Sequence, residues 1–96
     1  MPAYFIAIRE SVKDPEEMAL YSQKAKGSNA AFGGTPRVAY GPLTVLEGAP
    51  MEGAVIMEFP NREQAEAWYN SPAYQDALPH RQKGAVYRTF IVDGIG

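Results

Sequence analysis

Cysteine is missing from this sequence, histidine occurs once, and neither sign of charge dominates. The 96 residues hold nine lysines and arginines and eleven acidic residues, for a formal net charge of -2. Without cysteine, the chain forms no disulfide, thiolate metal site or iron–sulfur cluster, and it offers no thiol nucleophile. One histidine cannot complete a protein-only metal site of the usual kind. We therefore expect neither a metal nor another cofactor.

Long apolar runs and clusters of basic residues are also missing. The apolar run Met1–Ile8 ends at Arg9 and Glu10, and it is too short for a signal peptide or a membrane span. Lysines and arginines are scattered, so no surface that follows a nucleic-acid backbone is expected. These absences, together with the lack of disulfides, favour a cytoplasmic protein that contacts neither a membrane nor nucleic acid.

The length suits a single domain, which we place at residues 1–96. Runs rich in aromatic and β-branched residues predict four strands, at residues 3–9, 35–47, 54–59 and 85–92. Gly41-Pro42 interrupts the second run, which predicts a kink, a bulge or two short strands there. Proline also favours a position at the edge of the sheet for this strand.

Capping residues mark the start of a first helix. Asp14 can accept from the free backbone amides, Pro15 suits the first helical position, and Glu17 stands where it can complete a capping box. The helix is expected to run to about residue 31, with Gly33-Gly34 as its stop.

A second helical region follows the third strand. Asn61 and Gln64 repeat the signal for a helix start, and Ser71-Pro72 predicts a short restarted helix. Pro79 is expected to end that helix, because proline lacks the amide donor that a helix interior needs.

The resulting order is β-α-β-β-α-β, and its two halves resemble each other. An aromatic residue follows seven positions after each cap, from Asp14 to Tyr21 and from Asn61 to Trp68. This order predicts an α+β, ferredoxin-like domain, with a four-stranded antiparallel sheet and two helices on one face. The first and third strands are central in that topology.

Both predicted central strands are apolar on both faces. In the first strand, Tyr4, Ile6 and Ile8 alternate with Phe5 and Ala7, and residues 54–59 show a similar pattern. Two helices can cover only one face, and each large apolar side chain left in water forgoes roughly 1.5–3 kcal/mol. A second copy of the chain, related by a two-fold axis, is the simplest cover for the other face. A tail or loop folded over that face, or a tolerated apolar patch, are the alternatives.

Several short motifs occur together along the chain. They are Ala31-Phe32-Gly33-Gly34, Leu46-Glu47-Gly48, Ile56-Met57-Glu58-Phe59-Pro60, Ala65, Trp68-Tyr69-Asn70-Ser71-Pro72, Tyr74 and Arg81. In this order they resemble a family of small bacterial proteins known as domain of unknown function 1330, in the dimeric α+β-barrel superfamily. Gly41-Pro42 departs from the family pattern and leaves the shape of that edge open.

The resemblance implies a ferredoxin-like protomer and a homodimer that closes a barrel. It implies no particular reaction, because the wider superfamily includes cofactor-free monooxygenases, lactone isomerases, haem-degrading enzymes and stress-related proteins. Transfer of any of these activities would rest on the fold alone.

Three charged or titratable residues are candidates for catalysis. Glu58 is a carboxylate within an apolar strand, where burial would raise its pKa, although pairing with Arg9, Arg81 or Arg88, or exposure, is the commoner outcome. His80 could act as a general base or a haem ligand, or it could simply lie at an exposed helix end. Arg81 could bind a substrate carboxylate, or it could cap carbonyls or pair with Glu58.

Aromatic residues are the candidates for ligand binding. Trp68, Tyr69 and Tyr74, with Tyr21, could line a cleft between helices and sheet, although core packing is the default for Tyr21 and Trp68. The leading hypothesis is a homodimer that binds a small organic molecule in such a cleft, with or without cofactor-free monooxygenase- or isomerase-like catalysis. A non-catalytic dimeric interaction or stress-related protein is the alternative, and haem binding through His80 is a third hypothesis.

Overall fold

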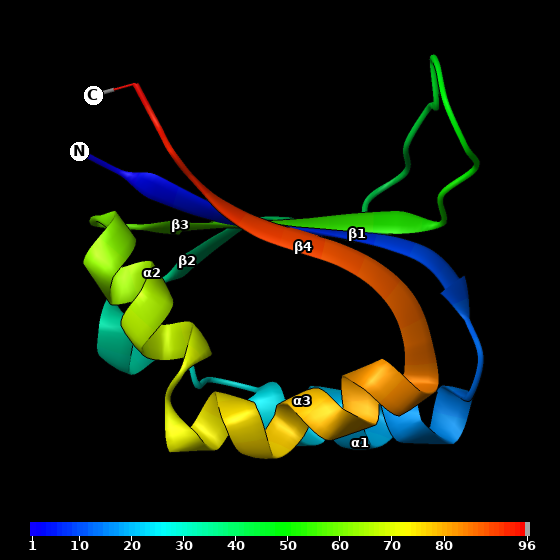
Figure 1. Ribbon diagram of the computed structural model, residues 1–96, viewed down its shortest axis with the longest axis horizontal. Coiled ribbons are helices and arrows are strands. Elements are labelled where there is room, and N and C mark those ends of the chain that lie inside the picture. The colour runs from blue at the N-terminus through cyan, green and yellow to red at the C-terminus, as the bar shows by residue number, and fades with distance from the viewer. Residues whose placement is uncertain (96) are drawn as a thin grey trace.

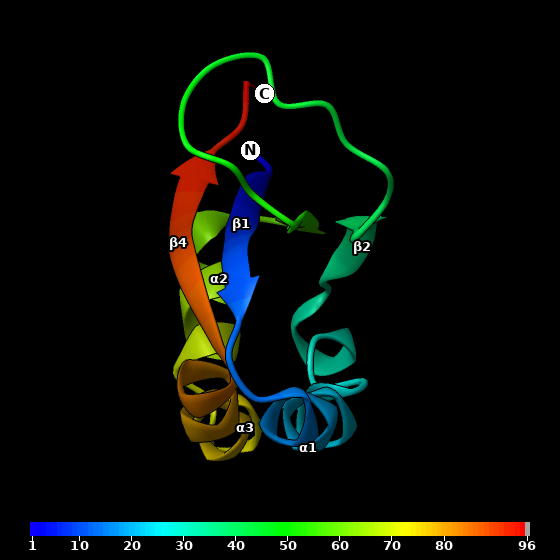
Figure 2. The same cartoon turned by 90° about the vertical axis from the view of Figure 1, so that its right-hand side faces the viewer.

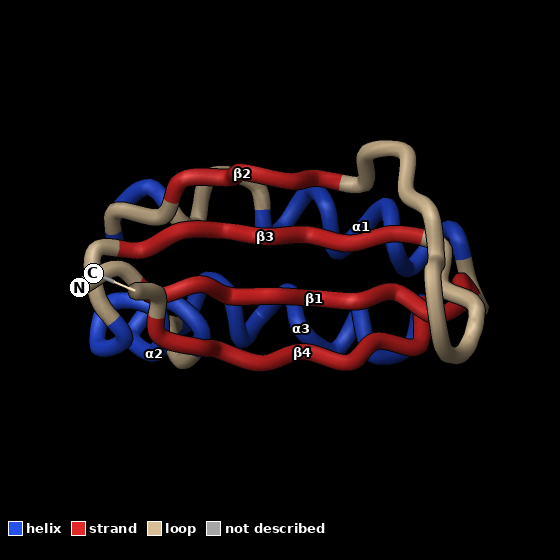
Figure 3. The backbone as a smooth tube through the Cα atoms, turned by 90° about the horizontal axis from the view of Figure 1, so that it is seen from above, coloured by secondary structure: helices blue, strands red, loops and turns tan. Residues whose placement is uncertain are grey.

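The computed structural model describes residues 1–95 and contains four strands, three α-helices and one 3-10 turn. In chain order these are β1 (Ala3–Val12), α1 (Pro15–Ala25), η1 (Ala30–Phe32), β2 (Thr35–Ala39), β3 (Gly53–Phe59), α2 (Arg62–Tyr69), α3 (Pro72–Gly84) and β4 (Ala85–Asp93). The four strands form one antiparallel sheet in the order β2-β3-β1-β4, and all helices lie on one face of it (Figure 1). The predicted α+β ferredoxin-like architecture is confirmed, with β1 and β3 central (Figure 3).

The predicted helix starts are confirmed by their caps. Asp14 Oδ1 accepts from the Glu16 amide at 3.0 Å, Asn61 Oδ1 from the Gln64 amide at 2.8 Å, and Ser71 Oγ from the Tyr74 amide at 3.3 Å. The capping box at Asp14 is not completed. The Asp14 amide donates to the Gly84 carbonyl at 3.0 Å instead, because the end of α3 lies against the start of α1.

Two predicted helix ends are wrong. The first helix ends at Ala25 rather than near residue 31, because Gly27 turns the backbone to a φ of 77° and only the short turn η1 follows. Pro79 lies within α3 instead of ending it. Its ring is on the exposed side of the helix, where water can satisfy the carbonyl that loses its donor.

The second predicted strand is shorter than expected. β2 ends at Ala39, and Tyr40 takes a φ of 58°, so residues 40–52 leave the sheet as a loop. This loop, green in Figures 1 and 2, rises on the side of the sheet that has no helices. β2 is an edge strand, as its proline predicts, and its pairing with β3 shifts register between Pro36 and Val38.

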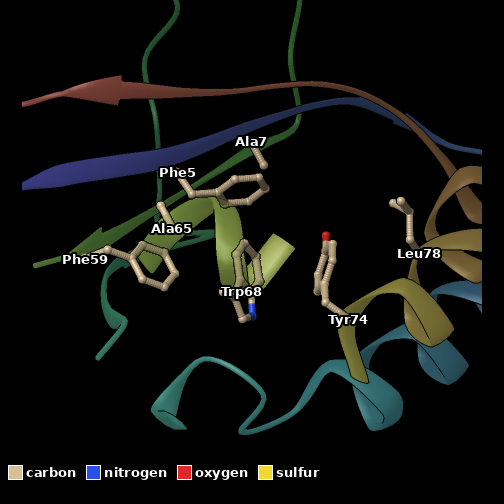
Figure 4. Close-up of a cluster of buried hydrophobic side chains, with 7 residues drawn as sticks. All are labelled: Phe5, Ala7, Phe59, Ala65, Trp68, Tyr74 and Leu78. Atoms are coloured by element: carbon tan, nitrogen blue, oxygen red, sulfur yellow. The ribbon is translucent and has the colours of Figure 1, made fainter. Parts of the chain in front are cut away.

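An aromatic core fills one end of the layer between sheet and helices (Figure 4). The Trp68 ring lies 4.9 Å from Phe5, 5.4 Å from Phe59 and 4.3 Å from Tyr74, measured between ring centroids. Its indole nitrogen donates to Ser28 Oγ at 3.0 Å, so the polar atom of the ring is satisfied. Phe5 and Ala7 of β1 therefore belong to the helix-covered face.

The other face of the sheet is apolar and carries no helix. Strand register places seven apolar residues on this open face: Tyr4, Ile6, Ile8, Ala54, Ile56, Phe90 and Val92. Phe90 is 47% exposed and Val92 is 43% exposed in the protomer. Both faces of the central strands are apolar, as the sequence predicts, and within residues 1–95 the helices cover one of them.

Within residues 1–95, no helix is both long and apolar enough to cross a membrane.

Candidate functional site

A buried arginine stands at the end of the helix layer away from the aromatic core. Arg81 is only 5% exposed, and its Nε and Nη1 atoms have no hydrogen-bond partner within residues 1–95. Its guanidinium stacks on the Tyr87 ring, 4.9 Å from the centroid. A stacked ring does not replace hydrogen bonds, and buried charges are normally paired. Arg81 is therefore a buried charge with two nitrogen atoms that lack a hydrogen-bond partner within the described residues.

Helical spacing positions Arg81. Tyr74, Leu78 and Arg81 follow steps of four and three residues, so they lie on one buried face of α3. Gly84 allows α1 to approach the end of this helix, because a Cβ there would lie 2.8 Å from Met18 Cγ. The helices α1 and α3 therefore pack closely together on the covered face of the sheet.

Four tyrosines near Arg81 form two hydrogen-bonded pairs, one between α1 and α3 and one between the turn after β2 and β4. The hydroxyl groups of Tyr21 and Tyr74 are 2.9 Å apart, and those of Tyr40 and Tyr87 are 2.5 Å apart. Burial raises the pKa of Tyr21, Tyr40 and Tyr74 above the ordinary tyrosine value, and the Arg81 charge only partly opposes this for the Tyr74 pKa. These hydroxyls are therefore neutral at physiological pH and can donate hydrogen bonds.

Tyr40 can reach Tyr87 because its backbone has a positive φ and because Gly53, which lies against its ring, has no side chain. Its φ of 58° turns the ring back over β3, where a Cβ on Gly53 would lie 2.7 Å from the ring. The Arg9 guanidinium lies 4.4 Å from the centroid of the same ring. Arg9 Nε is also 3.2 Å from Glu52 Oε1, without the angle of a hydrogen bond.

A pocket of about 390 Å³ opens beside Arg81 at the β4 edge of the sheet. It is lined by Lys13, Tyr69, Arg81, Gln82, Ala85, Val86, Tyr87 and Thr89. A second pocket of about 270 Å³ lies along the same edge and shares Tyr69 and Thr89 with the first. Its other lining residues are Phe5, Phe90 and Ile91. These volumes are close to the size range of small-molecule sites.

The structure brings together three of the six predicted site residues. Arg81 and Tyr69 line the larger pocket, and Tyr74 packs against Tyr69 with their ring centroids 5.3 Å apart. Trp68 belongs to the aromatic core and does not line either pocket.

Glu58 and His80 lie elsewhere. Glu58 shares the open face with Tyr4 and pairs with an arginine, as expected, but its partner is Arg37, at 3.2 Å, rather than Arg9, Arg81 or Arg88. β2 carries Arg37 to this position because it pairs directly with β3. His80 Nδ1 lies 2.6 Å from Glu17 Oε2 and links α3 to α1. This contact also explains why Glu17 does not complete the capping box.

Sequence reasoning missed Arg9, Lys13, Tyr40 and Tyr87 as members of the site. Only Arg9 carried a usable signal, since it follows Phe5 and Ala7 at two-residue steps and thus shares their covered face. Tyr87 lies in β4, which begins after the helix of Arg81 has ended, and Tyr40 lies at a turn after β2, so no helical or strand spacing connects either tyrosine with Arg81. Residues 1–95 contain no group of three histidine or acidic side chains that could hold a metal ion.

Comparison with known structures gives the same fold in proteins of low identity. RPA0582, a protein of unknown function from Rhodopseudomonas palustris, matches with a TM-score of 0.78 and 16% identity, over 99% of this chain and 83% of that one. A protein from Bacteroides fragilis, described as dimeric and ferredoxin-like, matches with a TM-score of 0.58 and 14% identity, over 97% of this chain and 96% of that one. SnoaB from Streptomyces nogalater, described as a cofactor-independent oxygenase, matches with a TM-score of 0.67 and 10% identity, over 99% and 94%.

At these identities the likeness concerns the fold alone. No curated protein matches the chain. The model of one family matches residues 2–95, from end to end of the sheet and its helices. The chain belongs to this family, which is described as Domain of unknown function (DUF1330).

Proposed function

We propose that this protein binds a small organic molecule in the pocket between α3 and β4. The observation that carries the proposal is the buried guanidinium of Arg81, whose Nε and Nη1 lack partners within residues 1–95 beside a pocket of about 390 Å³. An unpaired buried charge lowers stability, and a ligand that accepts its hydrogen bonds would remove this penalty. Neighbouring tyrosine hydroxyls offer further donors for an oxygen-rich group.

Catalysis without a cofactor is part of the same proposal. Arg81 and Tyr87 both line the pocket, and the Arg81 charge could stabilise negative charge that develops on a bound oxygen. This fits an oxygenase- or isomerase-like reaction. The likeness to SnoaB adds only an analogy of fold to this step. Glu58 has no part in it within one protomer, because it lies on the other face of the sheet.

We further propose that the protein is a homodimer whose open faces pack together and close a barrel. Phe90 and Val92 expose large apolar groups there, and this face carries charges of both signs in the pairs Arg37–Glu58 and Arg88–Glu10. A patch with apolar residues and both charges can be complementary to its own copy across a two-fold axis. The dimeric description of the Bacteroides fragilis neighbour supports a homodimer, without reference to the face that it uses.

The alternative is a non-catalytic dimeric interaction protein. It is favoured by the loop of residues 40–52, where Leu46 is 88% exposed beside the open face. Under this alternative the pocket binds no small molecule and the loop serves protein contacts.

Native mass spectrometry of the protein as purified, followed by a thermal-shift screen of small organic molecules, separates these functions. We expect a dimer mass and at least one compound that raises the melting temperature of the wild type but not of Arg81→Met. A screen of neutral and charged compounds that gives no hit dependent on Arg81 would overturn the binding function.

The interface is tested by sedimentation at micromolar concentration. Val92→Glu places a charge on the open face and is expected to give monomers. Leu20→Glu is the matched control, because Leu20 is 41% exposed on α1 and lies away from that face. A Val92→Glu protein that remains dimeric would contradict the interface.

A further inference from the structure

The two adjoining pockets at the β4 edge have opposite chemistry. The larger pocket is lined by the cationic side chains Lys13 and Arg81 and by no acidic residue. The hydroxyls near it are neutral, since burial raises the pKa of Tyr21 and Tyr74. This end of the site therefore carries positive charge that no carboxylate of its lining compensates.

The smaller pocket is apolar along most of its wall. Phe5 and Ile91 belong to the helix-covered face of the sheet, whereas Phe90 of the edge strand β4 lies on the open face. Tyr69 and Thr89 line both pockets, so the cationic pocket and the apolar pocket adjoin at these two residues. Their volumes are about 390 Å³ and about 270 Å³.

We infer that the ligand is an amphipathic carboxylate, a monoanionic organic acid with an apolar or aromatic body. Its carboxylate pairs with Arg81, with Lys13 as a second cation, and its body passes Tyr69 to lie against Phe5 and Ile91. The inference rests on the proposed function and adds the chemical class of the ligand.

A carboxylate fits this site better than a phosphate group. Proteins commonly surround phosphates with several backbone amides from a glycine-rich loop or a helix start, and the pocket lining contains no glycine. The planar guanidinium matches a carboxylate in shape and charge, and one buried arginine balances one negative charge. The apolar extension adds affinity only for a molecule that carries carbon groups next to its acid.

Isothermal titration calorimetry with 3-phenylpropanoate and its neutral amide, 3-phenylpropanamide, tests the inference on the full chain. The two probes share an aromatic body and differ in the charge of the head. We expect wild-type protein to bind the acid at least tenfold more tightly than the amide, and Arg81→Gln to lose this preference. Lys13→Gln should reduce affinity for the acid by a smaller factor. Arg62→Gln is the control, since Arg62 is paired with Asp93 and lines neither pocket.

The outcomes distinguish an error about the chemical class of the ligand from an error about the existence of a binding site. Equal affinity for acid and amide, or an Arg81→Gln protein that keeps the preference, would overturn the carboxylate and leave the binding function intact. Binding of inorganic phosphate in competition with the acid would also overturn it. Absence of binding by both probes at millimolar concentration contradicts the inference, and the thermal-shift screen then decides the proposed function separately. Should Arg81→Gln fail to fold, the comparison of acid and amide on the wild type still decides the result.

Discussion

The two ends of the layer between sheet and helices are both aromatic, yet they are organised in opposite ways. At the α2 end, Phe5, Phe59 and Trp68 pack ring against ring, and the polar atom of Trp68 is satisfied by Ser28. At the other end, tyrosines meet through their hydroxyls and Arg81 is buried without a full set of partners. Tyr74 joins the two, with its ring against Trp68 and its hydroxyl on Tyr21.

This difference distinguishes residues that stabilise the fold from Arg81, whose charge the proposed ligand would pair with. Apolar rings gain stability from burial alone, whereas a buried guanidinium gains it only through partners. A site kept ready for a ligand commonly costs stability, because selection maintains function rather than maximal stability. Removal of a core ring at one end and removal of the Arg81 charge at the other should therefore change stability in opposite directions.

The largest effect is expected at the aromatic end. Phe59→Ala should lower the free energy of unfolding by about 3–5 kcal/mol, because it removes a fully buried ring and leaves a cavity. Urea denaturation followed by circular dichroism measures this loss. Leu46→Ala, at the exposed loop, should stay within about 0.5 kcal/mol of the wild type. A loss below about 1 kcal/mol for Phe59→Ala would show that this end is loosely packed.

At the opposite end, Arg81→Met should preserve or raise stability, by up to about 1–3 kcal/mol. The substitution keeps an unbranched side chain and removes an unpaired buried charge. The same urea titration, without ligand, gives the comparison with Phe59→Ala. A loss of more than about 2 kcal/mol would mean that Arg81 has a structural role, and the contrast between the two ends would disappear.

Alkaline titration tests whether the tyrosines at the Arg81 end are buried. Burial raises the pKa of Tyr21, Tyr40 and Tyr74, whereas unfolded tyrosine titrates near about 10. Above that pH the native state binds more protons than the unfolded state. The contribution of these tyrosines to the free energy of unfolding is therefore fully present below about pH 10 and is lost as the pH rises further. Absorbance at 295 nm should show three tyrosines of the folded protein that ionise at higher pH than tyrosine in the unfolded chain. Tyrosines that all ionise at their ordinary pKa in the folded protein would contradict this burial.

A double-mutant cycle isolates the bond between Tyr21 and Tyr74. Each of Tyr21→Phe and Tyr74→Phe should cost about 0.5–1.5 kcal/mol, because each leaves one hydroxyl without its partner. The double variant should lose less than the sum, which reveals the coupling energy. Additive losses would show that the two hydroxyls do not interact in solution.

The smallest effect is expected at Gly53. Gly53→Ala places a methyl group 2.7 Å from the Tyr40 ring, but this flexible side chain can swing outward. We expect stability to fall by less than about 1 kcal/mol, while the Tyr40 and Tyr87 rings separate. Ring chemical shifts in an NMR spectrum report this movement. Unchanged shifts for both rings would mean that Tyr40 does not lie over β3.

Local chemistry made much of the fold predictable. Asp14, Asn61 and Ser71 cap helices because their side chains accept from nearby backbone amides, and such signals require no knowledge of distant residues. The prediction that Pro79 ends the helix was wrong because a proline is tolerated on the side of a helix that is exposed to solvent. Which side is exposed depends on how the helix packs against the sheet.

The candidate site was predictable only in part. Arg81, Tyr69 and Tyr74 stand close together in sequence on neighbouring helices, so helical spacing could group them. Glu58 drew attention as a charge in an apolar strand, but its partner Arg37 comes from the adjacent strand, and sequence spacing does not reveal that pairing. Tyr40 and Tyr87 are 47 residues apart and meet only in the folded chain.

The amino-acid sequence alone determined the order of strands and helices, the central place of β1 and β3, and the apolar character of both sheet faces. These follow from periodicity and capping, which act over a few residues. Only the tertiary structure decided that Arg81 would be buried without a full set of partners, and that a cationic pocket would adjoin an apolar one. Whether a charge is buried and paired depends on side chains that come from distant segments of the chain. No pattern of neighbouring residues predicts those contacts.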